Sequence, residues 1–279
     1  MRILVTGASG KAGKWVVRDL VEVGHDVVAT DIVPALPDCP APFIRADLTD
    51  YGQAVAVLDG FEAVAHLANI PAPELFTPVH TLNTNNAMNS NVFLAAADRR
   101  LQRVVWASSE TTLGLPFDEP PRYAPVDEEH FPVPTTTYAL SKVVAETMAV
   151  QVSAWSGIPF AALRLSNVID PSDYDQFPTY WPHAQLRRWN LWGYIDARDA
   201  ASAFRHALQA TTEGAVSAIV ANDETVMDRP SVDLVREVFP GVELTHEISS
   251  HQTLLANDRA KNLFGWSPTH SWHDELGRP

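Results

Sequence analysis

Residues 6–13 read Thr-Gly-Ala-Ser-Gly-Lys-Ala-Gly, and this stretch decides the fold. It follows a short apolar run at 2–6, typical of a buried parallel strand, and it opens a helical pattern over 13–23. The three glycines let the chain turn tightly and let backbone N–H groups approach a pyrophosphate, while the helix N-terminus adds partial positive charge. A glycine-rich turn without a ligand is the alternative, but the strand–turn–helix context favours a dinucleotide site. The residues expected to bind the dinucleotide are Gly7, Ser9, Gly10, Lys11, Ala12 and Gly13.

Asp31 ends the second expected strand, residues 26–31, and lies 18 residues after the last of these glycines. An acid at this point accepts hydrogen bonds from the adenosine ribose hydroxyls, and it also repels a 2′-phosphate. No arginine follows it immediately. Asp31 therefore favours NAD over NADP as the cofactor, with acceptance of NADP left open; a solvated loop acid is the alternative.

Strand and helix patterns alternate along the first 220 residues. Further strands are expected near 41–46, 63–67, 103–108, 160–165 and 215–220, and helices near 51–58, 82–98, 138–155 and 199–209. Alternation at this spacing predicts an α/β fold with a doubly wound parallel sheet of the Rossmann type.

The composition of the chain changes after Leu165. Residues 170–194 are rich in Pro, Trp and Tyr and show no clear hydrophobic periodicity. We therefore expect a small discontinuous C-terminal lobe that binds the substrate. The expected division is 1–165 plus 195–220 for the NAD-binding domain, and 166–194 plus 221–279 for the substrate lobe.

Composition limits the classes of partner. The 279 residues are 46% hydrophobic and 19% charged, which suits a folded chain with a sizeable core. The formal net charge of −14 disfavours nucleic acid and anionic membrane surfaces as partners. One cysteine, Cys39, sits in a loop pattern and allows no intramolecular disulfide, which suits a reducing compartment. Without a visible leader or a long apolar segment, the sequence predicts a cytoplasmic protein that needs no metal.

Further motifs appear in a fixed order along the chain. They are Asp47-Leu48-Thr49-Asp50, His66-Leu67-Ala68-Asn69, the helix pattern over 85–96, Trp106-Ala107-Ser108-Ser109, Tyr138-Ala139-Leu140-Ser141-Lys142, Arg164-Leu165-Ser166-Asn167-Val168, Tyr194-Ile195-Asp196 and 263–268. Together with the glycine loop, this order resembles the extended short-chain dehydrogenase/reductase family, the NAD-dependent epimerase/dehydratase family. The resemblance covers nearly the whole chain, although Met88 and Asn89 replace the usual Gly and Thr.

The resemblance also implies roles for individual residues. Asp47 would bind the adenine amino group, Leu48 belongs to the same segment, and Leu67, Ala68 and Asn69 would border the cofactor. Asn85 matches a position that supports a proton relay, with a purely structural asparagine as the alternative. His66 is expected to pack at a strand end rather than to act in catalysis.

Tyr138 and Lys142 are the residues expected to carry the proton chemistry. Their i, i+4 spacing places them on one helix face, where a nearby ammonium favours the phenolate form of the tyrosine. Tyr138 is thus a candidate general acid/base, unless the two are only an exposed surface pair. The resemblance further implies that Lys142 holds the nicotinamide ribose. It also selects Ser109 over Ser108 as the hydroxyl that contacts the substrate oxygen, because Ser109 lies five residues before Gly114.

Two departures from the family pattern narrow the reaction. Only Glu110 follows the active serine, where dehydratases carry an Asp-Glu pair, so elimination of water is poorly supported. Trp192 stands where nucleotide-sugar enzymes usually carry an arginine, with Arg187 and Arg188 as substitutes nearby. The substrate residues we expect are Ser109, Glu110, Arg164, Asn167 and Arg188.

The resulting hypothesis is an NAD-dependent oxidoreductase or epimerase that transfers hydride at a hydroxyl carbon of a sugar or sugar derivative. A uronate-type sugar-acid dehydrogenase is the first alternative, because the short second lobe and the region around Ser109 are similar to uronate dehydrogenases. A non-catalytic NAD(P)-sensing protein is the second. The sequence leaves open whether the reaction is epimerisation or net oxidation, and whether the chain forms a homodimer.

Overall fold

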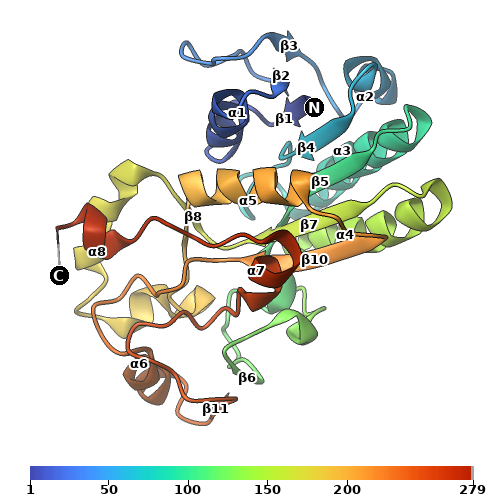
Figure 1. Cartoon of the computed structure of the whole chain (residues 1–279). Helices are drawn as coiled ribbons and strands as arrows, with labels where there is room; N and C mark the ends of the chain where they lie inside the picture. Colours follow the sequence, from blue (N-terminus) through green and yellow to red (C-terminus); the bar gives the residue numbers. More distant parts are fainter. Residues whose placement is uncertain (278–279) are drawn as a thin grey trace.

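A parallel sheet of seven strands forms the centre of the computed structural model, which describes residues 1–277 (Figure 1). The strand order is β10-β7-β5-β4-β1-β2-β3, and every neighbouring pair is parallel. The strands are β1 (Arg2–Thr6), β2 (Asp26–Asp31), β3 (Phe43–Arg45), β4 (Ala63–His66), β5 (Arg103–Ser109), β7 (Phe160–Leu165) and β10 (Ala215–Val220). The predicted doubly wound Rossmann-type sheet is therefore confirmed.

Helices cover both faces of this sheet (Figure 1). One face carries α1 (Gly13–Glu22) and α5 (Ala197–Gln209), joined by α7 (Asp258–Phe264) from the end of the chain. The other carries α2 (Tyr51–Leu58), α3 (Pro78–Asp98) and α4 (Thr137–Ser156). Because successive strand residues point to opposite faces, Ile3 and Val5 enter the first layer while Leu4 enters the second.

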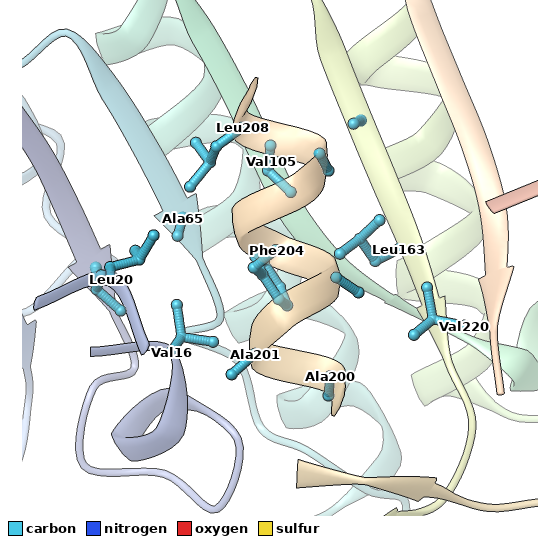
Figure 2. Packing of buried hydrophobic residues seen from close by; sticks show 14 of the residues in the cluster. Val16, Leu20, Ala65, Val105, Leu163, Ala200, Ala201, Phe204, Leu208 and Val220 are labelled. Atoms are coloured by element: carbon cyan, nitrogen blue, oxygen red, sulfur yellow. The ribbon is translucent and has the colours of Figure 1, made fainter. Parts of the chain in front are cut away.

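The layer beneath α5 is closely packed around one aromatic ring. Figure 2 shows Phe204 of α5 between Val16 and Leu20 of α1 on one side and Leu163 of β7 on the other. Phe204 is fully buried. The alanines at neighbouring positions of α5 let this helix lie close to the strands.

Local sequence determines where α4 and α3 begin. Thr136 caps α4 by accepting a hydrogen bond from the backbone N–H of Ala139 at 3.0 Å, so the helix starts one residue before Tyr138. Pro78 occupies the first turn of α3, where a missing N–H costs nothing, and the helix therefore begins four residues earlier than expected.

A second core lies at the C-terminal side of the sheet, shown in yellow, orange and red below it in Figure 1. It combines residues from 169–194 and 226–255 with Trp272, and it also takes in residues from 113–126. The remaining elements are the strand pairs β6 (Tyr123–Ala124) with β11 (Glu243–Leu244) and β8 (Val168–Ile169) with β9 (Ile195–Asp196), the helices α6 (Ser231–Val238) and α8 (Trp272–Glu275), and the 3₁₀ segments Glu110–Leu113, Glu128–His130, Pro171–Thr179 and Ala184–Asn190. The segment 113–126 belongs to this core through packing alone, and its sequence carries no signal of that.

The strand order changes direction between β1 and β4, since the chain passes from β1 to β2 and β3 on one side and continues with β4 on the other. In open α/β sheets a ligand binds at this point, beyond the carboxyl ends of the strands. Within residues 1–277, no helix combines the length and apolarity needed to cross a lipid bilayer.

Replacing Phe204 with Ala should lower the free energy of unfolding by about 3–5 kcal/mol, because it removes a fully buried ring and leaves a cavity under α5. Urea denaturation measures this change. Val23→Ala, at a site that is 49% exposed at the end of α1, serves as the control and should stay within about 0.5 kcal/mol of the parent chain.

Candidate active site

A cleft of about 930 Å³ opens at the carboxyl ends of the strands, a volume at the upper end of that of ligand pockets. Every residue expected to bind the cofactor lines it, from the glycine loop through Asp31, Asp47, Leu48 and 67–69 to Tyr138 and Lys142. Ser109, Glu110 and Asn167 line it as well. Three other predicted site residues, Asn85, Arg164 and Arg188, are absent from this lining.

The glycine loop passes so close to neighbouring backbone that side chains would not fit. A Cβ on Gly7, whose φ is +64°, would lie 2.6 Å from the backbone nitrogen of Ala68, and a Cβ on Gly13 would lie 2.0 Å from the carbonyl oxygen of Gly7. Backbone groups therefore face the cleft here, at the N-terminus of α1. This is the surface that a pyrophosphate needs, so the residues present fit a dinucleotide.

Asp31 is held against the loop at the end of β2. Its carboxylate accepts hydrogen bonds from the backbone N–H groups of Ser9 at 3.0 Å and Ile32 at 2.7 Å. Pairing of β2 with β3 also places Arg45 opposite Asp31, which sequence reasoning missed because the arginine is 14 residues away. Arg45 donates from Nε to the carbonyl of Ile32 at 2.7 Å and does not line the cleft.

Ser109, at the end of β5, meets Tyr138 from α4. The Ser109 hydroxyl is hydrogen-bonded to the Tyr138 phenol and also accepts from the N–H of Thr111 at 3.2 Å. Ser108 instead donates to the carboxylate of Glu146 at 2.5 Å. The structure thus brings together the serine and the tyrosine that the resemblance selected.

Lys142 reaches the same strand one residue earlier. Its Nζ donates to the carbonyl of Ala107 at 2.8 Å and lies 5.6 Å from the centre of the Tyr138 ring. Burial lowers the pKa of Lys142 to about 7, and the negative charge of Glu146 opposes this shift.

The pKa of Tyr138 lies above the ordinary value for a tyrosine, opposite to the expected direction. Burial raises the pKa of Tyr138 to about 12, the hydrogen bond with Ser109 lowers it, and the charge of Glu110 raises it further. Burial penalises the charged forms of both side chains, and the role of Lys142 in favouring the phenolate stays a prediction.

Asn85 is fully buried, and its side chain is hydrogen-bonded to neighbouring parts of the protein. Its carboxamide accepts from the N–H of Ile70 at 2.8 Å and donates to the carbonyl of Ile70 at 3.2 Å and to Ser141 at 3.3 Å. It therefore holds the cleft wall around Ile70 and has no surface in the cleft.

His66 is hydrogen-bonded to Thr6 at 2.7 Å and to Asn89 at 3.0 Å. Burial lowers the pKa of His66 to about 3, as suits a neutral packing residue.

Arg164 is not available to a substrate carboxylate. It forms a buried bidentate ion pair with Glu146, with Nε 3.0 Å from one carboxylate oxygen and a terminal nitrogen 2.8 Å from the other. The expectation that Arg164 binds substrate is corrected by this pair. Arg188 also lies away from the cleft lining, while Arg187 is buried and within electrostatic reach of Glu110.

Glu110 has the most unusual environment among the residues expected to contact the substrate. It is 3% exposed and lines the cleft, and it accepts hydrogen bonds from the Ser166 hydroxyl at 2.6 Å and from Asn190 at 3.3 Å. Burial raises the pKa of Glu110 to about 7, against the effect of these hydrogen bonds and of Arg187. Ser166 and Trp189 also line the cleft and were not predicted as site residues.

The family model for the NAD dependent epimerase/dehydratase family matches residues 3–221 of the chain. The chain belongs to this family. NAD is accordingly its cofactor.

Two proteins that are similar to this chain in sequence differ in their activities. A 2-alkyl-3-oxoalkanoate reductase from Stenotrophomonas maltophilia is 30% identical over 266 residues, which cover 87% of this chain and 76% of the relative. A putative UDP-glucose 4-epimerase from Methanocaldococcus jannaschii is 32% identical over 174 residues, covering 60% of this chain and 55% of the relative. The chain thus spans about half the length of the epimerases it matches.

Solved structures are similar over nearly the whole chain. A UDP-galactose 4-epimerase has a TM-score of 0.73 at 27% identity, with coverage of 99% of this chain and 96% of that one. A mutated uronate dehydrogenase has a TM-score of 0.70 at 21% identity, with coverage of 99% and 85%, and shows likeness of fold.

Replacing Asp31 with Ala should narrow the preference for NAD over NADP, because it removes the charge that opposes a 2′-phosphate. Calorimetric titration of both cofactors against both proteins measures the ratio of dissociation constants. Asp38→Asn, in a loop outside the cleft, is the control for a change in net charge. Tighter binding of NADP than of NAD to the parent chain would contradict the role of Asp31.

Proposed function

We propose that the chain is an NAD-dependent oxidoreductase or epimerase acting at a hydroxyl carbon of a sugar or sugar derivative. The observation that carries this proposal is the convergence of Ser109, Tyr138 and Lys142 on one cleft with the glycine loop. NAD, when bound, supplies the hydride acceptor. The residues expected to hold it are those of the glycine loop with Asp31, Asp47 and Lys142.

The protein's own groups handle the proton and the substrate oxygen. Tyr138 takes the proton from the substrate hydroxyl during oxidation and returns it during reduction. Ser109, hydrogen-bonded to that phenol, is placed to bind the same substrate oxygen. Lys142 lies beside the tyrosine ring, is oriented by the carbonyl of Ala107, and supplies positive charge there in its protonated form. All three side chains are buried in the wall of the cleft.

The alternatives differ in what happens to the hydride. An epimerase returns it to the opposite face of the same carbon, whereas a dehydrogenase releases NADH. Relatives of both kinds occur, including a UDP-glucose 4-epimerase from Lactobacillus helveticus and an NAD-dependent glucose-6-phosphate dehydrogenase from Haloferax volcanii. A non-catalytic NAD(P) sensor is disfavoured because the tyrosine and lysine are present and face the cleft.

We also propose the division of the chain into an NAD-binding domain (1–165 plus 195–220) and a substrate lobe (166–194 plus 221–279). The second hydrophobic core supports it. The single cysteine supports a cytoplasmic location, since a reducing compartment suits such a chain.

A homodimer is supported by the outer faces of α3 and α4. Across these two helices the Lys, Arg, Asp and Glu residues are Lys142 and Glu146, which are buried, and Asp98 at the very end. Apolar side chains are exposed there instead, with Leu94 at 40% and Val150 at 49%. Two copies of a chain with a net charge of −14 repel each other, so an uncharged face is where they approach at least cost.

Tyr138→Phe should lower the rate of NADH formation by roughly 10²–10⁴-fold, because it removes the proton-transfer group and keeps the ring. The measurement is NADH absorbance across a panel of sugars, uronates and nucleotide sugars, with NAD affinity expected to be nearly unchanged. Tyr51→Phe, which removes an exposed phenol hydroxyl bonded to Asp98, is the matched control. Near-normal turnover in the Tyr138 variant would assign proton transfer to another group.

The rate of oxidation by the parent chain should rise from pH 7 to 9, since the deprotonated phenol is the form that accepts a proton.

The double variant Leu94→Glu/Val150→Glu should convert the dimer to monomer, because it places charges on the face that two copies share. Light scattering after size-exclusion chromatography should give twice the 30.6 kDa of one chain for the parent and a single chain for the variant. Val23→Glu, exposed on α1, should leave the dimer intact. A monomeric parent chain at all concentrations would rule the dimer out.

A further inference from the structure

The substrate end of the cleft is the part not occupied by the predicted cofactor residues. Its walls are largely apolar and include Ile70, Pro71, Phe76, Leu165, Val168 and Trp189. Glu110 lies among them beside Ser109, so one buried carboxyl group faces an apolar wall at the point where the substrate oxygen is expected.

The partners of Glu110 hold this carboxyl group in place. Ser166 donates to one oxygen, Asn190 donates to the other, and the backbone of Asn167 provides a further hydrogen bond. A carboxylate has about four acceptor sites, so three donors leave capacity for one more. Because Glu110 lines the cleft, that capacity is available to a donor from the substrate.

Among the residues that the structure describes, the cleft lining contains no arginine that could receive an anionic substrate group. Over residues 1–277, the cationic or potentially cationic side chains in its lining are Lys11, Lys142 and His80. Lys11 belongs to the glycine loop and is paired with Asp173 at 2.6 Å, and Lys142 is bound to Ala107. His80 comes from the first turn of α3, where its ring lies 5.0 Å from that of Phe76.

The arginines expected to fill this role are placed elsewhere. Arg164 is paired with Glu146, and Arg187 donates to the carbonyl of Gly193 at 2.9 Å. Neither these two nor Arg188 belongs to the cleft lining. Above its pKa of about 7 Glu110 is ionised, and a carboxylate or diphosphate at the substrate end would then meet this negative charge. The Arg187 guanidinium, which acts on Glu110 electrostatically, is bonded to the carbonyl of Gly193 and lies outside the cleft lining, so it cannot form a bidentate pair with such a group.

We propose that Glu110 selects an uncharged, hydroxyl-bearing substrate, by accepting a hydrogen bond from a substrate hydroxyl and by repelling anionic groups. This rests on the proposed function and narrows its substrate class to neutral sugar derivatives. The apolar walls contact the carbon–hydrogen face of such a ring, and the hydroxyl groups are met by Ser109 and Glu110. Sugar acids and nucleoside diphosphate sugars are disfavoured.

The test measures binding of matched ligands to the full chain loaded with NAD. The ligands are galactose with galacturonate, glucose with glucuronate, and UDP as the diphosphate probe, each titrated by calorimetry at about pH 8.5, where Glu110 is ionised. We expect the neutral member of each pair to bind at least tenfold more tightly than its acid, and UDP not to compete with it. Glu110→Gln keeps the shape of the side chain, and its amide oxygen can still accept from Asn190. Its NH2 group can donate to the Ser166 hydroxyl, which can rotate to accept, so the melting temperature should stay close to that of the parent. It should strengthen binding of the acids about tenfold.

Glu128→Gln is the matched control. Glu128 is another partly buried acid, which accepts from the N–H of Ile219 at 2.8 Å and lies outside the cleft. Its variant should discriminate as the parent does. Tighter binding of the acids, competition by UDP, binding of neither member of any pair, or unchanged discrimination in Glu110→Gln would each overturn the proposal.

NADH formation in the same samples separates this inference from the proposed function. Oxidation of a uronate with acid-preferring binding would overturn the selection by Glu110 and leave the oxidoreductase in place. A second outcome is that the parent prefers neutral ligands and Glu110→Gln loses this preference, while the parent neither forms NADH nor epimerises any ligand. This outcome would support selection by Glu110 and contradict the proposed reaction.

Discussion

The close approach of the glycine loop to the end of β4 is the constraint on which the rest of the site depends. The backbone of Ala68 fills the space where a side chain of residue 7 would lie. Thr6 reinforces this contact by accepting hydrogen bonds from the N–H groups of Leu67 and Ala68, each at 3.2 Å. His66 then links Thr6 to Asn89 on α3. The two strands on either side of the topological switch are thus tied at their carboxyl ends, and the cleft can open only beyond them.

Burial then determines the charges in the cleft. Three residues form a buried polar cluster between α4 and the carboxyl ends of β5 and β7: Glu146, Arg164 and Ser108. Both carboxylate oxygens of Glu146 accept hydrogen bonds there. Removing one partner of such a pair leaves an uncompensated buried charge, which costs far more than the intact pair contributes. This explains why Arg164, although it ends a central strand beside the cleft, is unavailable to a ligand.

The sequence was most informative where chemistry is local. The glycine loop and the Tyr138–Lys142 pair each lie within eight residues, so spacing alone predicts that their groups act together. Arg164 was misjudged because its partner Glu146 comes from another element, 18 residues earlier. Arg45 was missed because only the pairing of β2 with β3 brings it opposite Asp31. Segment 113–126 gives no sign of its packing on the second core, because a short apolar segment packs equally well on many surfaces.

Burial favours the neutral form of both Tyr138 and Lys142. Burial raises the pKa of Tyr138 and lowers that of Lys142, so the phenol retains its proton and the ammonium loses its own near pH 7. Glu110 raises the pKa of Tyr138 further, whereas Glu146 opposes the effect of burial on Lys142, since each negative charge favours the protonated form of its neighbour. A phenolate at Tyr138 therefore needs additional positive charge nearby. Oxidised NAD, which the glycine loop, Asp31 and Lys142 would hold, would supply such a charge.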